Sequence, residues 1–136
     1  MDIVQEIEGD VVIQKVNLKR ATYNDAQDLT NNLQKDLNDG MRKIVVDLSS
    51  CNYMDSTFLG ALIQSLKNFS NHGGKIRLAG VQSEVEVLLN ITGMHRVFSI
   101  FKTKEEAVAS FKEWVIVLDL MRGLSFFIPK SEVLDS

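Results

Sequence analysis

A serine hydroxyl next to a carboxylate, placed where a strand passes into a helix, is the part of this sequence best suited to chemistry. Ser56 follows Asp55 and opens a segment whose apolar residues recur at helical spacing. Backbone N–H groups at a helix start are free, and the helix dipole is positive there. The hydroxyl of Ser56 therefore either caps the helix or carries an anion such as a phosphate.

Other reactive residues are few and are not arranged for catalysis. Cys51 is the only cysteine, which excludes an intrachain disulfide and a CxxC metal site, and we interpret it as a packed loop thiol. His72 and His95 are the only histidines and lack metal-ligand spacing. The nucleophile elbow G-x-S-x-G is absent around Ser56. We therefore expect no enzymatic activity, no metal and no cofactor.

The composition predicts an ordinary globular protein. The chain has 136 residues, of which 45% are hydrophobic and 24% charged, enough for one domain with a core. A net charge of −3, without a basic run, argues against direct nucleic-acid binding. No apolar stretch is long enough for a membrane span, and residues 1–6 do not resemble a signal peptide. We expect a cytoplasmic protein.

Strands and helices are predicted to alternate along residues 1–112. Two strands come first, at Ile3–Ile7 and Val11–Val16, and Gly9 allows the tight turn between them. Further on we expect helices at 23–38, at 56–71 and from two capping boxes, Ser83-x-x-Glu86 and Thr103-x-x-Glu106, and strands at 44–48, 75–79 and 97–101. The order β-β-α-β-α-β-α-β-α predicts an α/β fold, with a mixed sheet of four to five strands and covering helices.

Residues 113–136 form a separate apolar extension with two interpretations. In the first, Trp114 and Leu118 continue the helical face of Phe111, and the helix ends at Arg122-Gly123. In the second, the segment docks a second chain and makes a homodimer, because a stretch that is apolar all round must be buried somewhere. The β-branched residues 115–117 weaken the helical interpretation.

An ordered set of motifs resembles the STAS domain family, and within it the bacterial anti-sigma factor antagonists. The central motif is Val45-Val46-Asp47-Leu48-Ser49 followed by Met54 to Leu62, which resembles the family's phosphorylation-site region. Weaker matches follow in the expected order at 75–81, 88–94, 98–101 and 105–107. The resemblance covers roughly residues 3–112 and leaves the extension out.

This resemblance implies a STAS-like fold and a switch in protein binding. Such antagonists bind an anti-sigma factor that is also a serine kinase, are released when that kinase phosphorylates their serine, and are reset by a serine phosphatase. The phosphorylated serine maps onto Ser56. The partner-binding residues implied with Ser56 are Asn52, Asp55, Thr57, Phe58 and Leu59.

The sequence departs from the family pattern at two places. Phe58 stands where the family often has glycine, so its ring is either a core residue or a contact for a partner. Lys19 and Arg20 occupy a loop in which the family often carries an aspartate. Neither departure affects Ser56 itself.

Two other functions remain open at this stage. One is a STAS module that does not switch, such as a scaffold in a sensory complex or a subunit of a lipid-transport complex. The other is a module that binds a nucleotide or a lipid, with the helix start at Ser56 as the anion site.

Overall fold

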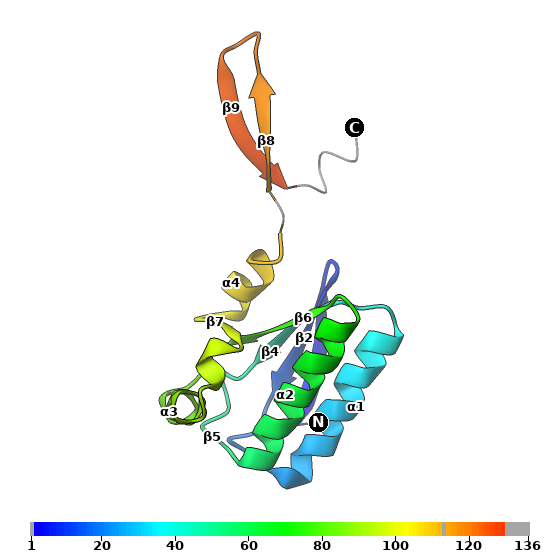
Figure 1. Cartoon of the computed structure of the whole chain (residues 1–136), viewed down its shortest axis with the longest axis vertical. Coiled ribbons are helices and arrows are strands. Elements are labelled where there is room, and N and C mark those ends of the chain that lie inside the picture. Colours follow the sequence, from blue (N-terminus) through cyan, green and yellow to red (C-terminus); the bar gives the residue numbers. More distant parts are fainter. Residues whose placement is uncertain (1, 113, 130–136) are drawn as a thin grey trace.

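A five-stranded sheet forms the centre of the molecule. The computed structural model describes residues 2–112 and 114–129. The strands cross the sheet in the order β1 (Ile3–Glu8), β2 (Val11–Val16), β4 (Lys43–Asp47), β6 (Lys75–Ala79) and β7 (Ser99–Phe101) (Figure 1). β1 is antiparallel to β2, and the other neighbours are parallel. This arrangement confirms the predicted mixed sheet.

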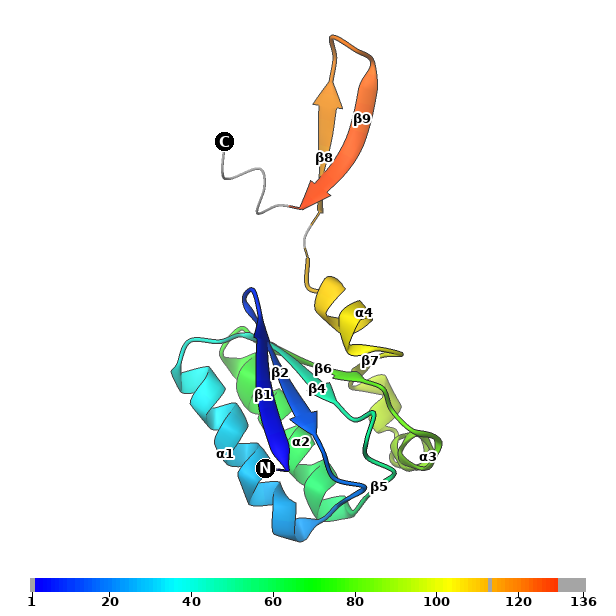
Figure 2. The same cartoon turned by 180° about the vertical axis from the view of Figure 1, so that it is seen from behind.

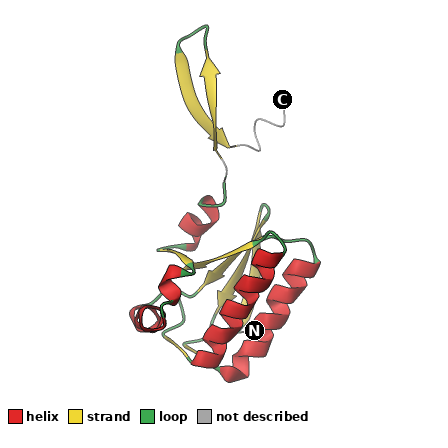
Figure 3. Ribbon diagram, viewed as in Figure 1, coloured by secondary structure: helices red, strands yellow, loops and turns green. Residues whose placement is uncertain are grey.

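Helices cover both faces of this sheet. α1 (Tyr23–Asn38) and α2 (Ser56–Asn71) lie side by side on one face, and α3 (Ser83–Thr92) packs into the same core (Figures 1 and 3). The short α4 (Lys104–Ala109) packs on the other face, against β4, β6 and β7. The predicted bounds of α1 and α2 are confirmed, because both helices repeat buried apolar residues at helical spacing.

Two local predictions need correction. Ser83 is not a cap: it is the first residue of α3, and the cap is Gln82, whose side chain makes no capping bond. The strand predicted at 97–101 is shorter, because a 3₁₀ helix over Met94–Arg96 leads into it and β7 begins only at Ser99. The cap at Thr103 does form, and its hydroxyl accepts a hydrogen bond from the N–H of Glu106 at 3.1 Å.

Two hydrophobic clusters hold the layers together. The larger one lies between the sheet and α1, α2 and α3, and its bulkiest fully buried members are Phe58 and Phe69 of α2. The smaller one lies under α4, where Ala107 and Phe111 pack on Ile13 and its strand neighbours. Each fully buried large apolar side chain contributes about 1.5–3 kcal/mol, so the inner face of α2 anchors that helix firmly.

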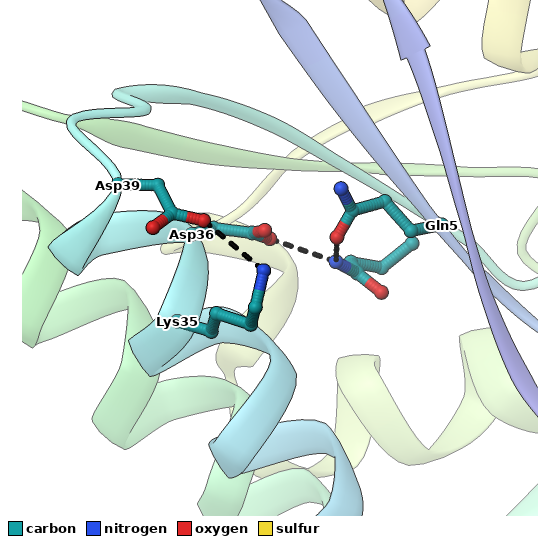
Figure 4. Close-up of polar contacts among 5 residues, drawn as sticks. Gln5, Lys35, Asp36 and Asp39 are labelled. Carbon is teal, nitrogen blue, oxygen red and sulfur yellow. Dashed lines mark hydrogen bonds and ion pairs between the residues drawn. The ribbon is translucent and has the colours of Figure 1, made fainter.

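A polar cluster is enclosed between α1 and the first two strands. The side chain of Gln14, fully buried on β2, donates hydrogen bonds to Asp36 Oδ2 at 2.7 Å and to Gln5 Oε1 at 3.1 Å (Figure 4). Asn32 of α1 donates to Gln14 Oε1 at 3.4 Å. Burial raises the pKa of Asp36, although the hydrogen bond from Gln14 opposes this shift.

The segment after α4 is a hairpin, so the helical interpretation of residues 114–129 is wrong. β8 (Trp114–Asp119) pairs antiparallel with β9 (Leu124–Pro129), and the hairpin stands clear of the sheet and its helices (Figures 1 and 2). β-branched and aromatic residues favour strands over helix. Gly123, with φ of 67°, permits the turn. Residues 113 and 130–136 of the predicted extension lie outside the described residues.

Candidate functional site

A small second ladder brings the starts of α1 and α2 together. β3 (Arg20–Ala21) runs parallel to β5 (Tyr53–Met54), and each strand leads directly to one of the two helices. The carbonyl of Lys19 accepts hydrogen bonds from the N–H groups of Asn52 at 2.8 Å and Tyr53 at 3.0 Å. The N–H of Asp55 donates to the carbonyl of Ala21 at 3.0 Å. These bonds fix the loop before α1 against the loop before α2.

The carboxylate of Asp55 caps α2 and also reaches α1. Its Oδ1 accepts a hydrogen bond from the N–H of Phe58 at 2.9 Å, which is the usual N-cap contact. Its Oδ2 accepts from the N–H of Tyr23, the first residue of α1, at 2.8 Å. The cap of α2 is therefore Asp55, which corrects the interpretation of Ser56 as a cap.

Ser56 is the first residue of α2, and it is exposed. Since Asp55 already provides the capping oxygen, the Ser56 hydroxyl is not needed to cap the helix. Thr57, the next residue, is exposed as well. The site therefore presents a primary hydroxyl to solvent, at the positive end of a 16-residue helix. It is suited to accepting a phosphoryl group.

The structure divides the predicted partner-binding residues into two groups. Asn52, Ser56 and Thr57 are exposed, and Asp55 is half-buried. Phe58 and Leu59, in contrast, are buried in the main core, with exposed fractions of 0% and 4%. Their side chains pack against the domain itself, which favours the core interpretation of Phe58, and their role in partner binding stays a prediction.

Residues not singled out by the motif also line this surface. The guanidinium of Arg20 lies 4.2 Å from the centre of the Tyr53 ring, in cation–π contact, and both side chains are exposed. Tyr23 is exposed at the start of α1. Tyr53 is close to Ser56 in the sequence, but no sequence signal connected Tyr23 with Ser56, because that proximity depends on the pairing of β3 with β5. We call Lys19, Arg20, Tyr23, Asn52, Tyr53, Ser56 and Thr57 the switch surface.

The only cysteine of the chain, Cys51, lies beside this surface and is packed, as we predicted from the sequence. Cys51 is fully buried, and its Sγ donates a hydrogen bond to the carbonyl of Tyr53 at 3.2 Å. Burial raises the pKa of this thiol, which keeps it protonated and unreactive. Within residues 2–112 and 114–129, no three His, Cys, Asp or Glu side chains are grouped so that they could hold a metal ion. No helix in the described part of the chain is long and apolar enough to cross a membrane.

Two surface hollows lie away from Ser56. One, of about 390 Å³, runs between α1 and α2 and is lined by residues such as Gln34 and Asn68. The other, of about 460 Å³, lies between α3 and β7 and is lined by residues such as Glu86 and His95. A small molecule held in either hollow would not touch the Ser56 hydroxyl, so neither one supports a ligand-binding role for this serine.

The chain belongs to the STAS domain family. The family model matches residues 5–107, which include the whole five-stranded sheet apart from its first two residues. The match ends before the hairpin of β8 and β9 begins. The resemblance noted from the motif around Ser56 is thereby confirmed at the level of the family.

Relatives within this family are classed as anti-sigma factor antagonists. One from Thermotoga neapolitana is 38% identical over 72 residues, which are 53% of this chain and 64% of the relative. The anti-sigma-B factor antagonist of Staphylococcus aureus is 38% identical over 56 residues, 41% of this chain and 52% of that protein. The matched segments thus span about half to two thirds of the length of these relatives.

A solved structure matches a larger share of this chain than the two relatives above do. The crystal structure of a protein from Thermotoga maritima, classed as an anti-sigma factor antagonist, superimposes with a TM-score of 0.74. It is 31% identical and covers 79% of this chain and 92% of its own. The mixed sheet with its covering helices is therefore the STAS fold.

Proposed function

We propose that the protein is an anti-sigma factor antagonist controlled by phosphorylation of Ser56. In its unmodified form it binds an anti-sigma factor that is also a serine kinase, and this releases the sigma factor. The kinase then transfers the γ-phosphoryl group of ATP to the Ser56 oxygen. The phosphorylated protein dissociates, and a serine phosphatase removes the phosphate. These partners act in the cytoplasm.

The single observation that carries this proposal is the placement of Ser56. Its hydroxyl is exposed at the first position of α2, and the neighbouring Asp55 carries out the capping. A kinase can therefore reach the serine without unfolding the helix. The names of the relatives support the choice of partner, and the exposed members of the switch surface provide the area for contact.

The electrostatics around Ser56 allow a phosphate on the folded domain. The Asp55 carboxylate lies next in sequence, but its two oxygens accept N–H bonds from the starts of both α1 and α2. The positive ends of two helix dipoles therefore offset its charge. Repulsion between Asp55 and a phosphate of about −1.5 to −2 charges is correspondingly weakened.

The phosphate would weaken the binding of a partner much more than it would affect the fold of the domain. A contact packed over Ser56 would enclose a bulky dianion in a space suited to a hydroxyl. Leaving such a charge buried and unpaired costs several kcal/mol, and about 4 kcal/mol corresponds to roughly a thousandfold loss of affinity. Phosphorylation of Ser56 alone can thus dissociate the complex, without a conformational change in the rest of the domain.

The test uses the full chain and the kinase that it binds. Unmodified protein captures the kinase from the cells of origin, and the purified kinase is then titrated with the wild type, Ser56→Ala and Ser56→Asp by calorimetry. We expect Ser56→Ala to bind as tightly as the wild type and Ser56→Asp to bind at least about a hundredfold more weakly. Peptide mapping after incubation with ATP should find the phosphate on Ser56.

Thr57→Ala provides the matched control, because it removes the adjacent exposed hydroxyl and leaves Ser56 in place. This variant should bind and be phosphorylated like the wild type. Equal affinities of Ser56→Ala and Ser56→Asp would contradict the switch and favour a STAS scaffold that does not respond to phosphate. Phosphate found only on Thr57 would move the switch to that residue.

A further inference from the structure

Two basic residues of the switch surface, Lys19 and Arg20, have no role in the proposed switch so far. Both side chains are exposed. The pairing of β3 with β5 places Arg20 directly opposite Tyr53, and the carbonyl of Lys19 accepts the N–H groups of Asn52 and Tyr53. Backbone contacts therefore hold both basic residues against the loop that leads into Ser56.

The Tyr53 ring holds the guanidinium of Arg20 in place. The guanidinium carbon lies 4.2 Å from the ring centre, and Tyr53 is itself 41% exposed. Stacking on an aromatic face orients the plane of a guanidinium and leaves the N–H donors at its edge available for binding. Less side-chain entropy is then lost when these donors bind an acceptor, so Arg20 is prepared for a contact with another molecule.

Neither of these cations has an acidic partner within residues 2–112 and 114–129. The salt bridges in this part of the chain join other residues. The acids at the starts of α1 and α2 are used as caps: Asp25 accepts the N–H of Thr22 at 2.9 Å, and Asp55 accepts N–H groups from both helices. Lys19 and Arg20 therefore present positive charges to solvent without a counter-ion from the described domain.

The kind and number of these residues favour a protein as the molecule that they bind. Anionic lipid surfaces and nucleic acids are typically bound by clusters of about four to ten cations, whereas the switch surface has two. Arginine and tyrosine are among the residues that contribute most to the affinity of protein interfaces. The fork of a guanidinium also matches the two oxygens of a carboxylate. The surface is therefore suited to an acidic side chain of another protein.

We infer that Lys19 and Arg20 select a kinase that has acidic residues where it contacts the switch surface. This inference rests on the proposed function, because it takes the anti-sigma factor kinase as the protein that covers Ser56. Arg20, oriented by Tyr53, binds a carboxylate of the kinase, and Lys19 adds a second charge contact. A kinase with basic or apolar residues at this place would leave both cations desolvated without a partner and is therefore rejected.

A phosphate on Ser56 would act on the same charges. It carries about −1.5 to −2 charges at neutral pH, which offsets the two positive charges of Lys19 and Arg20. It would also repel the acidic residues of the kinase directly. Phosphorylation thus replaces attraction with repulsion, so the release of the kinase does not depend on steric exclusion alone.

The test compares two double variants of the full chain in the calorimetric titration of the purified kinase. The charge-reversal variant, Lys19→Glu/Arg20→Glu, should bind at least about a hundredfold more weakly than the wild type, because like charges would then face each other. The control, Lys67→Glu/Lys75→Glu, makes the same change in net charge on two exposed lysines toward the other end of α2 (Figure 1). It should bind like the wild type. Circular dichroism shows whether each variant is folded.

The contact itself is examined by salt, by the Tyr53 ring and by cross-linking. The wild type should lose at least about tenfold in affinity between about 0.05 and 0.5 M salt, and the charge-reversal variant should not, since salt screens the attraction. Tyr53→Leu should bind about tenfold more weakly and Tyr53→Phe normally, because a phenylalanine ring still supports the guanidinium. A carbodiimide, which joins an amine to a carboxylate, should link Lys19 to an acidic residue of the kinase. Links confined to other lysines would overturn the inference.

The outcomes separate this inference from the proposed function. A folded charge-reversal variant that binds within about threefold of the wild type, while Ser56→Asp binds weakly, would overturn the inference and leave the switch intact. Equal binding of Ser56→Ala and Ser56→Asp, with loss only in the charge-reversal variant, would keep the acidic contact and reject the switch. An equal loss in the control variant would reduce the effect to net charge and overturn the inference. Sedimentation of the wild type with phosphatidylglycerol vesicles, abolished by charge reversal while the kinase still binds, would overturn it in favour of a lipid surface.

Discussion

The carboxylate of Asp55 lies 2.8 Å from the backbone nitrogen of Tyr23 and accepts its hydrogen bond across 32 residues of sequence. The same carboxylate caps α2 through the N–H of Phe58 at 2.9 Å. One side chain therefore holds the starts of two helices that lie side by side on the sheet. Through this contact, the position of Ser56 depends on the loop before α1 as well as on its own helix.

Asp55→Ala should destabilise the domain by about 2–4 kcal/mol, because it removes a helix cap and a second hydrogen bond to a charged group. Asp55→Asn should cost less, since its single amide oxygen can still accept one of the two bonds. Denaturation in urea, followed by circular dichroism, measures both. Asp28→Ala is the control, because Asp28 is an exposed acid of α1 and should change stability by less than about 0.5 kcal/mol. An Asp55→Ala variant as stable as this control would show that the double cap contributes nothing.

Phe58→Ala should cost about 3–5 kcal/mol, because it leaves a cavity beneath α2 where the ring is fully buried. Phe58→Leu should cost less than Phe58→Ala, since it removes less of the packed volume. Thermal or urea unfolding of the full chain distinguishes the two, with exposed Thr57→Ala as the neutral reference. If Phe58→Ala kept normal stability but lost its kinase partner, the ring would be a binding contact rather than a core residue.

Ser56→Asp should leave the domain folded and slightly more stable, by about 0.3–1 kcal/mol at neutral pH and low salt, because a negative charge at a helix start interacts favourably with the dipole. The gain should shrink in high salt, which screens the charge. It should also be lost as the pH falls and the introduced carboxylate is protonated. Urea titrations at two salt concentrations measure this effect. A loss of more than about 2 kcal/mol would instead mean that phosphate acts by melting the start of α2.

Asp36 makes the stability depend on pH in a direction that can be tested. Its pKa is raised by burial above the ordinary 3.8, so the folded state binds this proton more tightly than the unfolded chain does. Asp36 therefore contributes most to stability at acidic pH, and its contribution falls as the pH rises from 3.8 through the folded pKa.

The variant Asp36→Asn removes this titration and keeps an oxygen that can accept the bond from Gln14. The free energy of unfolding of the wild type, minus that of the variant, should become less positive as the pH rises from about 3.5 to 7, starting near the reference pKa of an aspartate. Urea titrations at each pH measure this difference. A difference that grows with pH would mean that the pKa of Asp36 is lowered in the fold.

Periodicity along the chain was enough to predict most of the elements. The bounds of α1 and α2 and the strand at Val11–Val16 agree with the pattern of apolar residues, because each element must bury one face or both. The ordered set of motifs, with Met54 to Leu62 at its centre, was sufficient to identify the family. It also located Ser56, since a serine at a strand-to-helix junction is recognisable from local sequence alone.

The hairpin of β8 and β9 is the element that the pattern of apolar residues did not predict. Residues 114–118 are apolar at every position, which satisfies a helical face as well as a strand, and periodicity cannot decide between the two. The choice depends on pairing with residues 124–129, a contact that no local pattern specifies. The β-branched residues at 115–117 were the only local signal for the strand.

The sequence by itself determined the family, the order of the helices and of the strands of the main sheet, and the position of a serine at the start of α2, because these follow from residue type and spacing within short segments. Only the tertiary structure decided that Asp55 rather than Ser56 caps this helix, that Phe58 points into the core, and that Arg20 lies over the Tyr53 ring. Each of these depends on the parallel pairing of β3 with β5 or on the packing of α2 against the sheet. Such contacts join residues far apart in the chain, and their energies are realised only when the layers assemble.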